Sequence, residues 1–195
     1  MGLKKQFNNN LLVTLALFRT EQENLQEFVE YGDGDDIDDT DFSDDFDFAL
    51  YRGISVESEG VELEVAGYVT DTLKIQAGYT YLNMEDPNGE DARTFIPRKT
   101  FKLLAQWDPS WNEKLAMGLS ARWQDEIHFD SAYGPISQDS YAVIGGYVSY
   151  ELNDSISLTL NADNIADEEY LSSVKYEQSF YAAPRSYSVS IDWQL

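Results

Sequence analysis

The stretch from Arg185 to Leu195 alternates apolar and polar side chains without a break. Successive side chains of a β-strand point to opposite faces, so a strand here has one apolar face and one polar face. The apolar positions are Tyr187, Val189, Ile191, Trp193 and Leu195, and the positions between them carry only Ser, Asp and Gln. Aromatic side chains near both ends of the apolar band are typical of a strand that lies between lipid and a wet lumen.

Seven earlier stretches show the same period of two, although some are less regular. We expect strands over Leu11–Leu25, Ile54–Val69, Leu73–Leu82, Thr100–Trp107, Leu115–Gln124, Tyr141–Leu152, Ser155–Asp163 and Arg185–Leu195, preceded by the end of another strand at Met1–Phe7. A helix over 11–26 is the alternative for the first full strand, because Leu, Ala, Glu and Gln favour helices. The neighbouring strands favour the β interpretation.

The connections between these strands alternate in length. Short turns are expected at 8–10, 70–72, 108–114 and 153–154, and long loops at 27–51, 83–95, 125–140 and 164–183. Bacterial outer-membrane barrels connect their strands in this way, whereas a soluble all-β domain has no reason to place every long loop at one end. The predicted fold class is therefore an all-β, antiparallel transmembrane β-barrel segment of about eight to nine strands. Tyr79, Tyr81, Trp107, Trp123, Tyr187 and Trp193 are expected at the ends of its outward faces.

Composition excludes several other classes of protein. The 195 residues include 36 acidic and 13 basic side chains, for a net charge of -23, which makes nucleic acid a poor partner. The chain has no cysteine, so it forms no disulfide framework or thiolate metal site. It also lacks the run of about 18 apolar residues that a transmembrane helix needs.

The most acidic stretch has nine aspartates between Asp33 and Asp47, and we expect it to be a loop because like charges repel. Carboxylate oxygens are the ligands that calcium prefers. The candidate calcium ligands are Asp33, Asp35, Asp36, Asp38 and Asp39. The stretch does not match the EF-hand register, so a solvated acidic loop without a metal is the favoured interpretation.

No other stretch carries a catalytic motif. The single histidine, His128, lies in an expected loop with acidic neighbours, and no nucleophile is placed around it. We therefore expect no enzyme activity and no cofactor. Arg98 and Arg185 each follow a proline and are interpreted as strand-entry residues, with ligand contact as the alternative. Charges expected to point inward are Lys74, Lys102, Arg122, Glu62, Glu64 and Asp192; they are interpreted as lumen residues, with contact to an internal domain as the alternative.

Several segments together resemble the last part of the barrel of TonB-dependent siderophore receptors. The similar segments are A-L-F-R-T-E-Q-E-N (16–24), S-E-G-V-E-L-E-V-A-G (58–67), A-G-Y-T-Y (77–81), I-P-R-K-T-F-K-L (96–103), L-N-A-D-N-I-A-D-E-E-Y (160–170) and Y-A-A-P-R (181–185). They occur in the family's order and with its spacing, over essentially the whole chain. One departure is Leu195, where the family usually ends on an aromatic residue.

This resemblance implies a barrel of roughly 22 strands around a plug domain. It also implies uptake of ferric siderophores across the outer membrane, with lipid, the siderophore, the plug and the TonB complex as partners. We expect residues 1–195 to be the C-terminal part of such a barrel, with plug and signal peptide absent, because Met1–Lys5 is followed by no apolar core.

Two alternatives to the receptor interpretation follow from the same residues. Eight strands can close alone, as a free-standing outer-membrane barrel with a structural or porin-like role. A secreted acidic calcium-binding β domain is the other alternative. We expect an open sheet, because Met1–Phe7 is too short to close a barrel against Arg185–Leu195.

Overall fold

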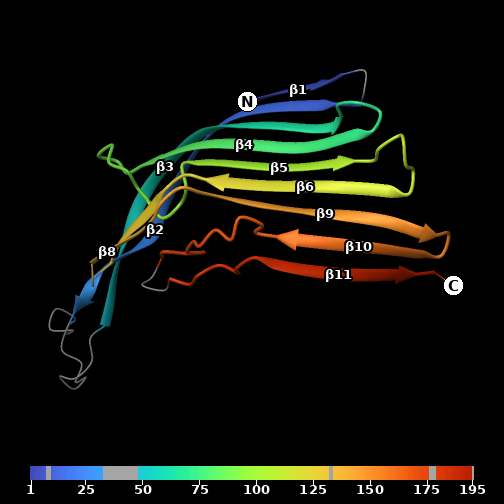
Figure 1. The fold of residues 1–195 in the computed structure, drawn as a ribbon. Helices are drawn as coiled ribbons and strands as arrows, with labels where there is room; N and C mark the ends of the chain where they lie inside the picture. The colour runs from blue at the N-terminus through green and yellow to red at the C-terminus, as the bar shows by residue number, and fades with distance from the viewer. Residues whose placement is uncertain (8–9, 33–47, 132–133, 176–178, 195) are drawn as a thin grey trace.

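A computed structural model describes residues 1–7, 10–32, 48–131, 134–175 and 179–194, which form an all-β fold (Figure 1). Its strands are β1 (Gly2–Gln6), β2 (Leu12–Gly32), β3 (Phe48–Tyr68), β4 (Leu73–Glu85), β5 (Lys99–Trp107), β6 (Leu115–Gln124), β7 (Ile127–Ser131), β8 (Gly134–Gln138), β9 (Tyr141–Asn153), β10 (Ile156–Asp163) and β11 (Ser186–Trp193). In the part of the chain that the structure describes, no helix is long and apolar enough to cross a membrane.

Nine of these strands form one antiparallel sheet in the order β1-β2-β3-β4-β5-β6-β9-β10-β11. The remaining two, β7 and β8, pair only with each other. Each strand of the large sheet lies beside its neighbour in the chain, except that the β7–β8 hairpin is inserted between β6 and β9. Figure 1 shows the short turns together at one end of the sheet and the long loops at the other. The alternation of short and long connections is therefore confirmed.

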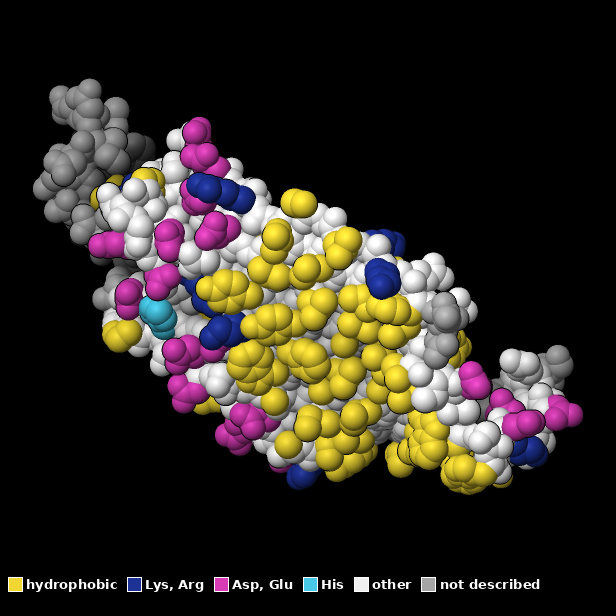
Figure 2. Space-filling model, turned by 90° about the horizontal axis from the view of Figure 1, so that it is seen from above, with side chains coloured by type: hydrophobic (Ala, Val, Ile, Leu, Met, Phe, Trp, Pro, Cys, Tyr) yellow, Lys and Arg dark blue, Asp and Glu magenta, His cyan; other side chains and the backbone are white. Residues whose placement is uncertain are grey.

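The register places most of the apolar positions of the strands on one face. Across the middle of the sheet, Val65 pairs with Ala77, Ala77 with Leu103, and Leu103 with Ala121. The same face continues through Leu119, Val148, Leu160 and Val189, which are all more than 40% exposed. Figure 2 shows hydrophobic side chains gathered in a broad patch, with acidic side chains beyond it at both ends. Such a band is what a lipid-facing barrel wall requires.

Aromatic side chains border this band, as the sequence predicts. At the short-turn end, Trp107 pairs with Leu73, and Trp193 with Ile156. At the long-loop end, Trp123 pairs with Phe101, and Tyr187 with Ala162. Aromatic rings at both borders match the two interface girdles of an outer-membrane barrel.

The opposite face carries the polar positions and two close contacts between an aromatic ring and a glycine. Phe18, which interrupts the polar face of β2, pairs with Gly60, and a Cβ atom at Gly60 would lie 2.6 Å from its ring. Tyr147 of β9 pairs with Gly118, and a Cβ atom there would overlap the tyrosine ring. Both rings therefore occupy the space that a side chain at the paired glycine would fill.

The structure differs from the expected element bounds at the long-loop end. The expected loop over 27–51 is wrong at both ends, because β2 continues to Gly32 and β3 begins at Phe48. The expected loop over 125–140 contains the β7–β8 hairpin. Both segments project beyond the apolar band, where water wets both faces and a strand needs no alternation.

The two edge strands of the sheet, β1 and β11, do not pair with each other among the described residues. The expectation of an open sheet is confirmed. β1 is indeed a short strand, paired with Leu12–Ala16. The helical alternative for 11–26 is wrong, because residues 12–26 lie in β2.

A charge on the outward face should prevent membrane insertion, whereas the same charge on the inward face should not. Leu119 and Ser120 are neighbours on β6, both exposed, on opposite faces of the sheet. We expect Leu119→Arg to cost about 2–4 kcal/mol near the bilayer midplane and Ser120→Arg much less. The measurement is the fraction of refolded protein that resists urea extraction from lipid vesicles. Equal losses from the two variants would contradict the assignment of the faces.

Candidate functional site

Three long loops come together at one end of the sheet. Thr94 and His128 exchange two hydrogen bonds: His128 N donates to Thr94 O at 3.1 Å, and Thr94 Oγ1 donates to His128 O at 2.9 Å. Gln138 Oε1 accepts a hydrogen bond from Leu171 N at 2.7 Å. We call the described residues of 86–98, 125–140 and 164–185 the outer loop cluster. Because its loops bond to one another, it is a connected unit and not three separate loops.

A small hydrophobic core lies under the first of these loops. Val56, Met84 and Ala92 are buried there, packed against Leu25, Ile54, Leu82 and Ile96. The register puts Val56 on the same face as Gly60 and Glu62, which is the polar face of the sheet lower down. Loop 86–98 therefore folds over the inward face of the sheet, above the lipid-facing band.

Arg98 holds this loop in place. Its Nη2 donates to the carbonyl oxygens of Ala92 at 2.6 Å and Met84 at 3.3 Å, and it lies 3.7 Å from the carboxylate of Asp91. The side chain is only 20% exposed. Arg98 thus joins the end of β4 to the returning loop, which confirms its interpretation as a strand-entry residue. Arg185, the other such residue, bonds to Asp167 through its backbone N at 3.0 Å and its side chain at 3.3 Å.

The third loop is attached to the inward wall through Tyr170. Its ring stacks on Tyr141 with centroids 4.1 Å apart, and its hydroxyl accepts a hydrogen bond from Arg122 Nη2. Tyr170 is 7% exposed. Arg122 is therefore a loop anchor on the inward face, and not an unengaged lumen charge.

A pocket of about 210 Å³ opens between the loops and the outer part of β2 and β3. Phe95 lines this pocket: Lys175 Nζ lies 4.7 Å and the Arg93 guanidinium 5.8 Å from its ring centroid, and Phe129 packs edge-on at 6.0 Å. The other lining residues are Gln26, Glu27, Ile54, Asp91, Thr94 and Asp130. Two cations beside the Phe95 ring, together with three carboxylates in the lining, suit an aromatic ligand that carries charges of both signs.

The candidate calcium ligands cannot be placed in this site. Asp33, Asp35, Asp36, Asp38 and Asp39 lie outside the described residues. Within the described ranges, no group of three or more histidine, aspartate or glutamate side chains could hold a metal ion. His128 lies on β7, where its backbone pairs with Ser137 and Thr94.

The pocket residues were not predicted as a site from the sequence. Phe95 and Phe129 are aromatic residues in otherwise polar loops, and Arg93 and Lys175 are two of only 13 basic residues in the chain. Those features could have marked each residue individually as a candidate binding residue. Their convergence from two separate loops and β7 depends on non-local contacts.

Comparison with known proteins assigns the fold to a family. A family profile described as "TonB dependent receptor-like, beta-barrel" matches residues 1–165. The chain belongs to this family. The receptor barrel lies in the outer membrane, as predicted, and its resemblance to siderophore receptors is confirmed.

The receptor barrel is similar to several curated siderophore receptors. It is 28% identical over 201 residues to the ferric-pyoverdine BN7/BN8 receptor of Pseudomonas putida, covering 100% of this chain and 22% of that protein. It is 29% identical over 185 residues to the catecholate siderophore receptor Fiu of Escherichia coli (strain K12), covering 89% and 22%. This chain spans about a fifth of the length of the curated relatives it matches.

Solved structures give the same assignment. The pyoverdine outer membrane receptor FpvA of Pseudomonas aeruginosa PAO1, bound to pyoverdine, superposes with a TM-score of 0.84 at 25% identity. The match covers 100% of this chain and 29% of that one. This chain also superposes on the structure of FpvAI in complex with pyocin S2, with a TM-score of 0.82 at 25% identity. That match covers 98% of this chain and 26% of the other.

Loss of the Arg98 anchor should loosen loop 86–98 without unfolding the sheet. Arg98→Met removes the two hydrogen bonds to Ala92 and Met84 carbonyls, which we expect to cost about 1–3 kcal/mol of local stability. The measurement is hydrogen exchange of the Ala92 amide, which donates to Met84 O at 2.9 Å. Arg52→Met removes an exposed ion pair with Glu27 and serves as the control. Equal exchange in the two variants would contradict the anchoring role.

The turn at Asp86 should loosen in acid. Backbone N–H donors, first that of Glu90 and then those of Asn88 and Gly89, hold the pKa of the Asp86 carboxyl below its ordinary 3.8. A lowered folded-state pKa stabilises the turn above the ordinary value, and this stabilisation is lost as pH falls through the folded value. We therefore expect exchange of the Glu90 amide, corrected for intrinsic rate, to rise below about pH 4. Asp86→Asn should abolish this pH dependence; a persistent dependence would assign it to another group.

Proposed function

We propose that this chain is the barrel wall and outer-loop part of an outer-membrane receptor for TonB-dependent uptake of ferric siderophores. The observation that carries the proposal is the match of the whole sheet, together with its loops, to the pyoverdine receptor bound to pyoverdine. Curated relatives named for two different siderophore classes support the same function.

The pocket around Phe95 supports a role for the outer loop cluster in capture. Arg93 and Lys175 can attract the anionic groups of a ferric siderophore, while Phe95 and Phe129 contact its aromatic rings. Glu27, Asp91 and Asp130 line the same pocket and disfavour ligands that carry only negative charge. The proposed ligand is therefore a ferric siderophore that combines anionic and cationic groups.

We further propose that the plug domain and the contact with the TonB complex come from a part of the receptor outside these 195 residues. The curated relatives are several times longer than this chain. On the polar face, Glu62 and Glu64 of β3 and Lys102 of β5 flank Thr80 and Gly78 of β4, so charges of both signs point into the lumen. Transport of this kind makes and breaks no covalent bond, so the proposed function is not enzymatic.

The alternative of a free-standing, porin-like barrel of eight strands is not favoured. The sheet has nine strands whose edges do not pair, and the relatives are siderophore receptors. No observation on the described residues supports a secreted calcium-binding domain in its place.

Calorimetry on the full chain refolded in detergent tests the capture step. Ferric pyoverdine and a ferric catecholate are titrated separately, each with its iron-free form as the reference. We expect at least one ferric complex to bind, and Arg93→Ser with Lys175→Ser to weaken that binding about tenfold, because each cation–aromatic contact contributes about 0.5–2 kcal/mol. Lys114→Ser, at the short-turn end, is the matched control. Absence of binding by both ferric complexes, or equal weakening by the control, would contradict the proposed pocket.

A further inference from the structure

The outer half of β3 has a neighbouring strand on one side only. β2 pairs with β3 from Phe48 to Ala66, whereas β4 pairs with it only from Glu57 to Tyr68. On the β4 side, the stretch 48–56 therefore forms a strand edge above the lipid-facing band. Exposed edges present unpaired N–H and C=O groups and are ready templates for another strand.

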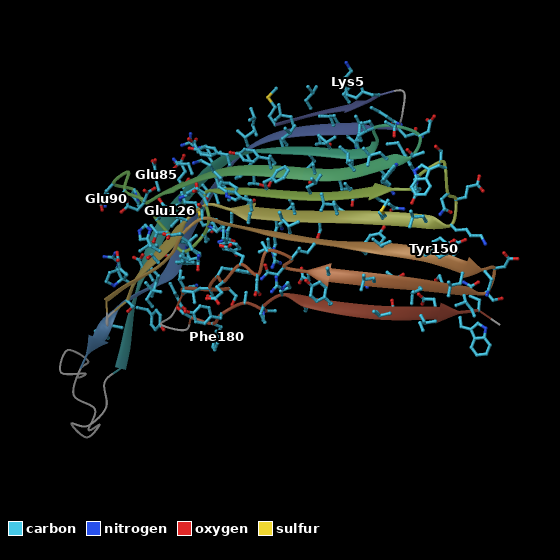
Figure 3. All side chains as sticks on the ribbon, viewed as in Figure 1. Lys5, Glu85, Glu90, Glu126, Tyr150 and Phe180 are labelled. Atoms are coloured by element: carbon cyan, nitrogen blue, oxygen red, sulfur yellow. The ribbon has the colours of Figure 1, made fainter. Side chains whose placement is uncertain are left out.

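The edge is open because β4 leaves the sheet at Asp86. If β4 continued beyond the Glu57–Glu85 pair in the same register, the residues after Glu85 would lie opposite Val56 to Arg52 of β3. Instead the chain turns: the Asp86 carboxylate accepts hydrogen bonds from Asn88 N at 2.8 Å and Glu90 N at 3.0 Å. The returning chain then pairs with the end of β4 itself, through Glu85 and Asp91. Figure 3 shows Glu85 and Glu90 at this turn, at the long-loop end of the sheet. One strand position is thus left vacant.

Two backbone positions point at the vacancy. In an antiparallel sheet the N–H and C=O of one residue point to the same side, and the side alternates along the strand. Val69 N donates to Leu73 O at 2.9 Å, so odd-numbered residues of β3 face β4 and even-numbered residues face β2. Both bulges of the β2–β3 pair lie on β2, so the alternation on β3 continues outward. Gly53 and Ser55 therefore aim their backbone groups into the vacant position.

The vacancy is a groove of about 460 Å³ between β3 and the turn. Gly53 and Ser55 line one side, and Asp86, Glu90 and Asp91 line the other. Glu27 and Arg52 also line it, but they bond to each other at 2.8 Å. Asp91 has a long contact of 3.7 Å to Arg98, and no ion pair engages Asp86 or Glu90 among the described residues. The groove therefore combines unpaired backbone groups with an excess of carboxylates.

We propose that this groove binds an extended, basic polypeptide segment of another protein, which adds as a strand to the edge of β3. Backbone hydrogen bonds from Gly53 and Ser55 hold the segment, as in other cases of strand addition. Basic side chains on the segment complement Asp86, Glu90 and Asp91. A second copy of this chain is a poor occupant, because its net charge of -23 matches that of the groove in sign. This inference does not depend on the siderophore proposal.

The backbone part of the proposal is tested with a labelled synthetic peptide of alternating Lys and Val, added to the full chain in detergent. We expect saturable binding by fluorescence anisotropy, and exchange of the Gly53 and Ser55 amides slowed at least about tenfold in the complex. Ser55→Pro removes the N–H that faces the groove and should abolish binding, because Pro is tolerated at a strand edge but cannot donate. Ser55→Ala keeps the N–H and should bind as the parent chain does.

Further measurements keep the test decisive. Unchanged exchange of the Ile54 amide, which faces β2, shows that Ser55→Pro leaves the β2–β3 pair intact. Glu90→Lys should weaken the basic peptide about tenfold, and a peptide of alternating Glu and Val should not bind the parent chain. The proposal is overturned if Ser55→Pro binds normally, if the acidic peptide binds equally well, if no peptide binds, or if light scattering shows that this edge instead pairs two copies of the chain.

Discussion

The fold depends on one constraint: every backbone N–H and C=O in the hydrocarbon layer needs a partner within the protein. A continuous sheet meets this requirement only when adjacent strands stay in register, and a shift by one residue would turn every side chain to the wrong face. The observed register keeps apolar side chains on one face from Val13 on β2 to Val189 on β11. Backbone hydrogen bonding and the burial of apolar side chains in lipid thus favour the same strand register. That register also fixes where each loop begins and ends.

The same constraint explains which parts of the fold were predictable. Where lipid covers one face, the alternation of residues such as Leu158, Thr159 and Leu160 is enough to locate a strand and assign its faces. Above the lipid, β2 and β3 continue through Glu27 and Arg52, where both faces meet water and charge is tolerated. The stretch 27–51 was interpreted as a loop because of the nine aspartates between Asp33 and Asp47, but its two ends, which lie outside that acidic run, belong to β2 and β3. The β7–β8 hairpin was missed because it too lies outside the membrane, where a strand needs no alternation of apolar and polar residues.

The candidate site was less predictable than the fold, because its contacts join residues far apart in the chain. Arg122 and Tyr170 are separated by 48 positions, and nothing local in either segment indicates their hydrogen bond. Arg98 could be interpreted correctly, since a residue after a proline at a strand entry has local partners, here Ala92 and Met84. The calcium-site hypothesis for 33–47 rested only on the number of aspartates in that stretch. These aspartates lie outside the described residues.

The glycines opposite Phe18 and Tyr147 have a consequence for the space that the wall encloses. Each ring can lie against the next strand because its neighbour there, Gly60 or Gly118, has no side chain. Any larger residue at Gly118 would lift the tyrosine ring off the wall and direct it toward the axis of the barrel. At these points the width of the lumen open to a plug or a passing ligand therefore depends on glycine being present on one strand, and not on the size of the aromatic ring on the other.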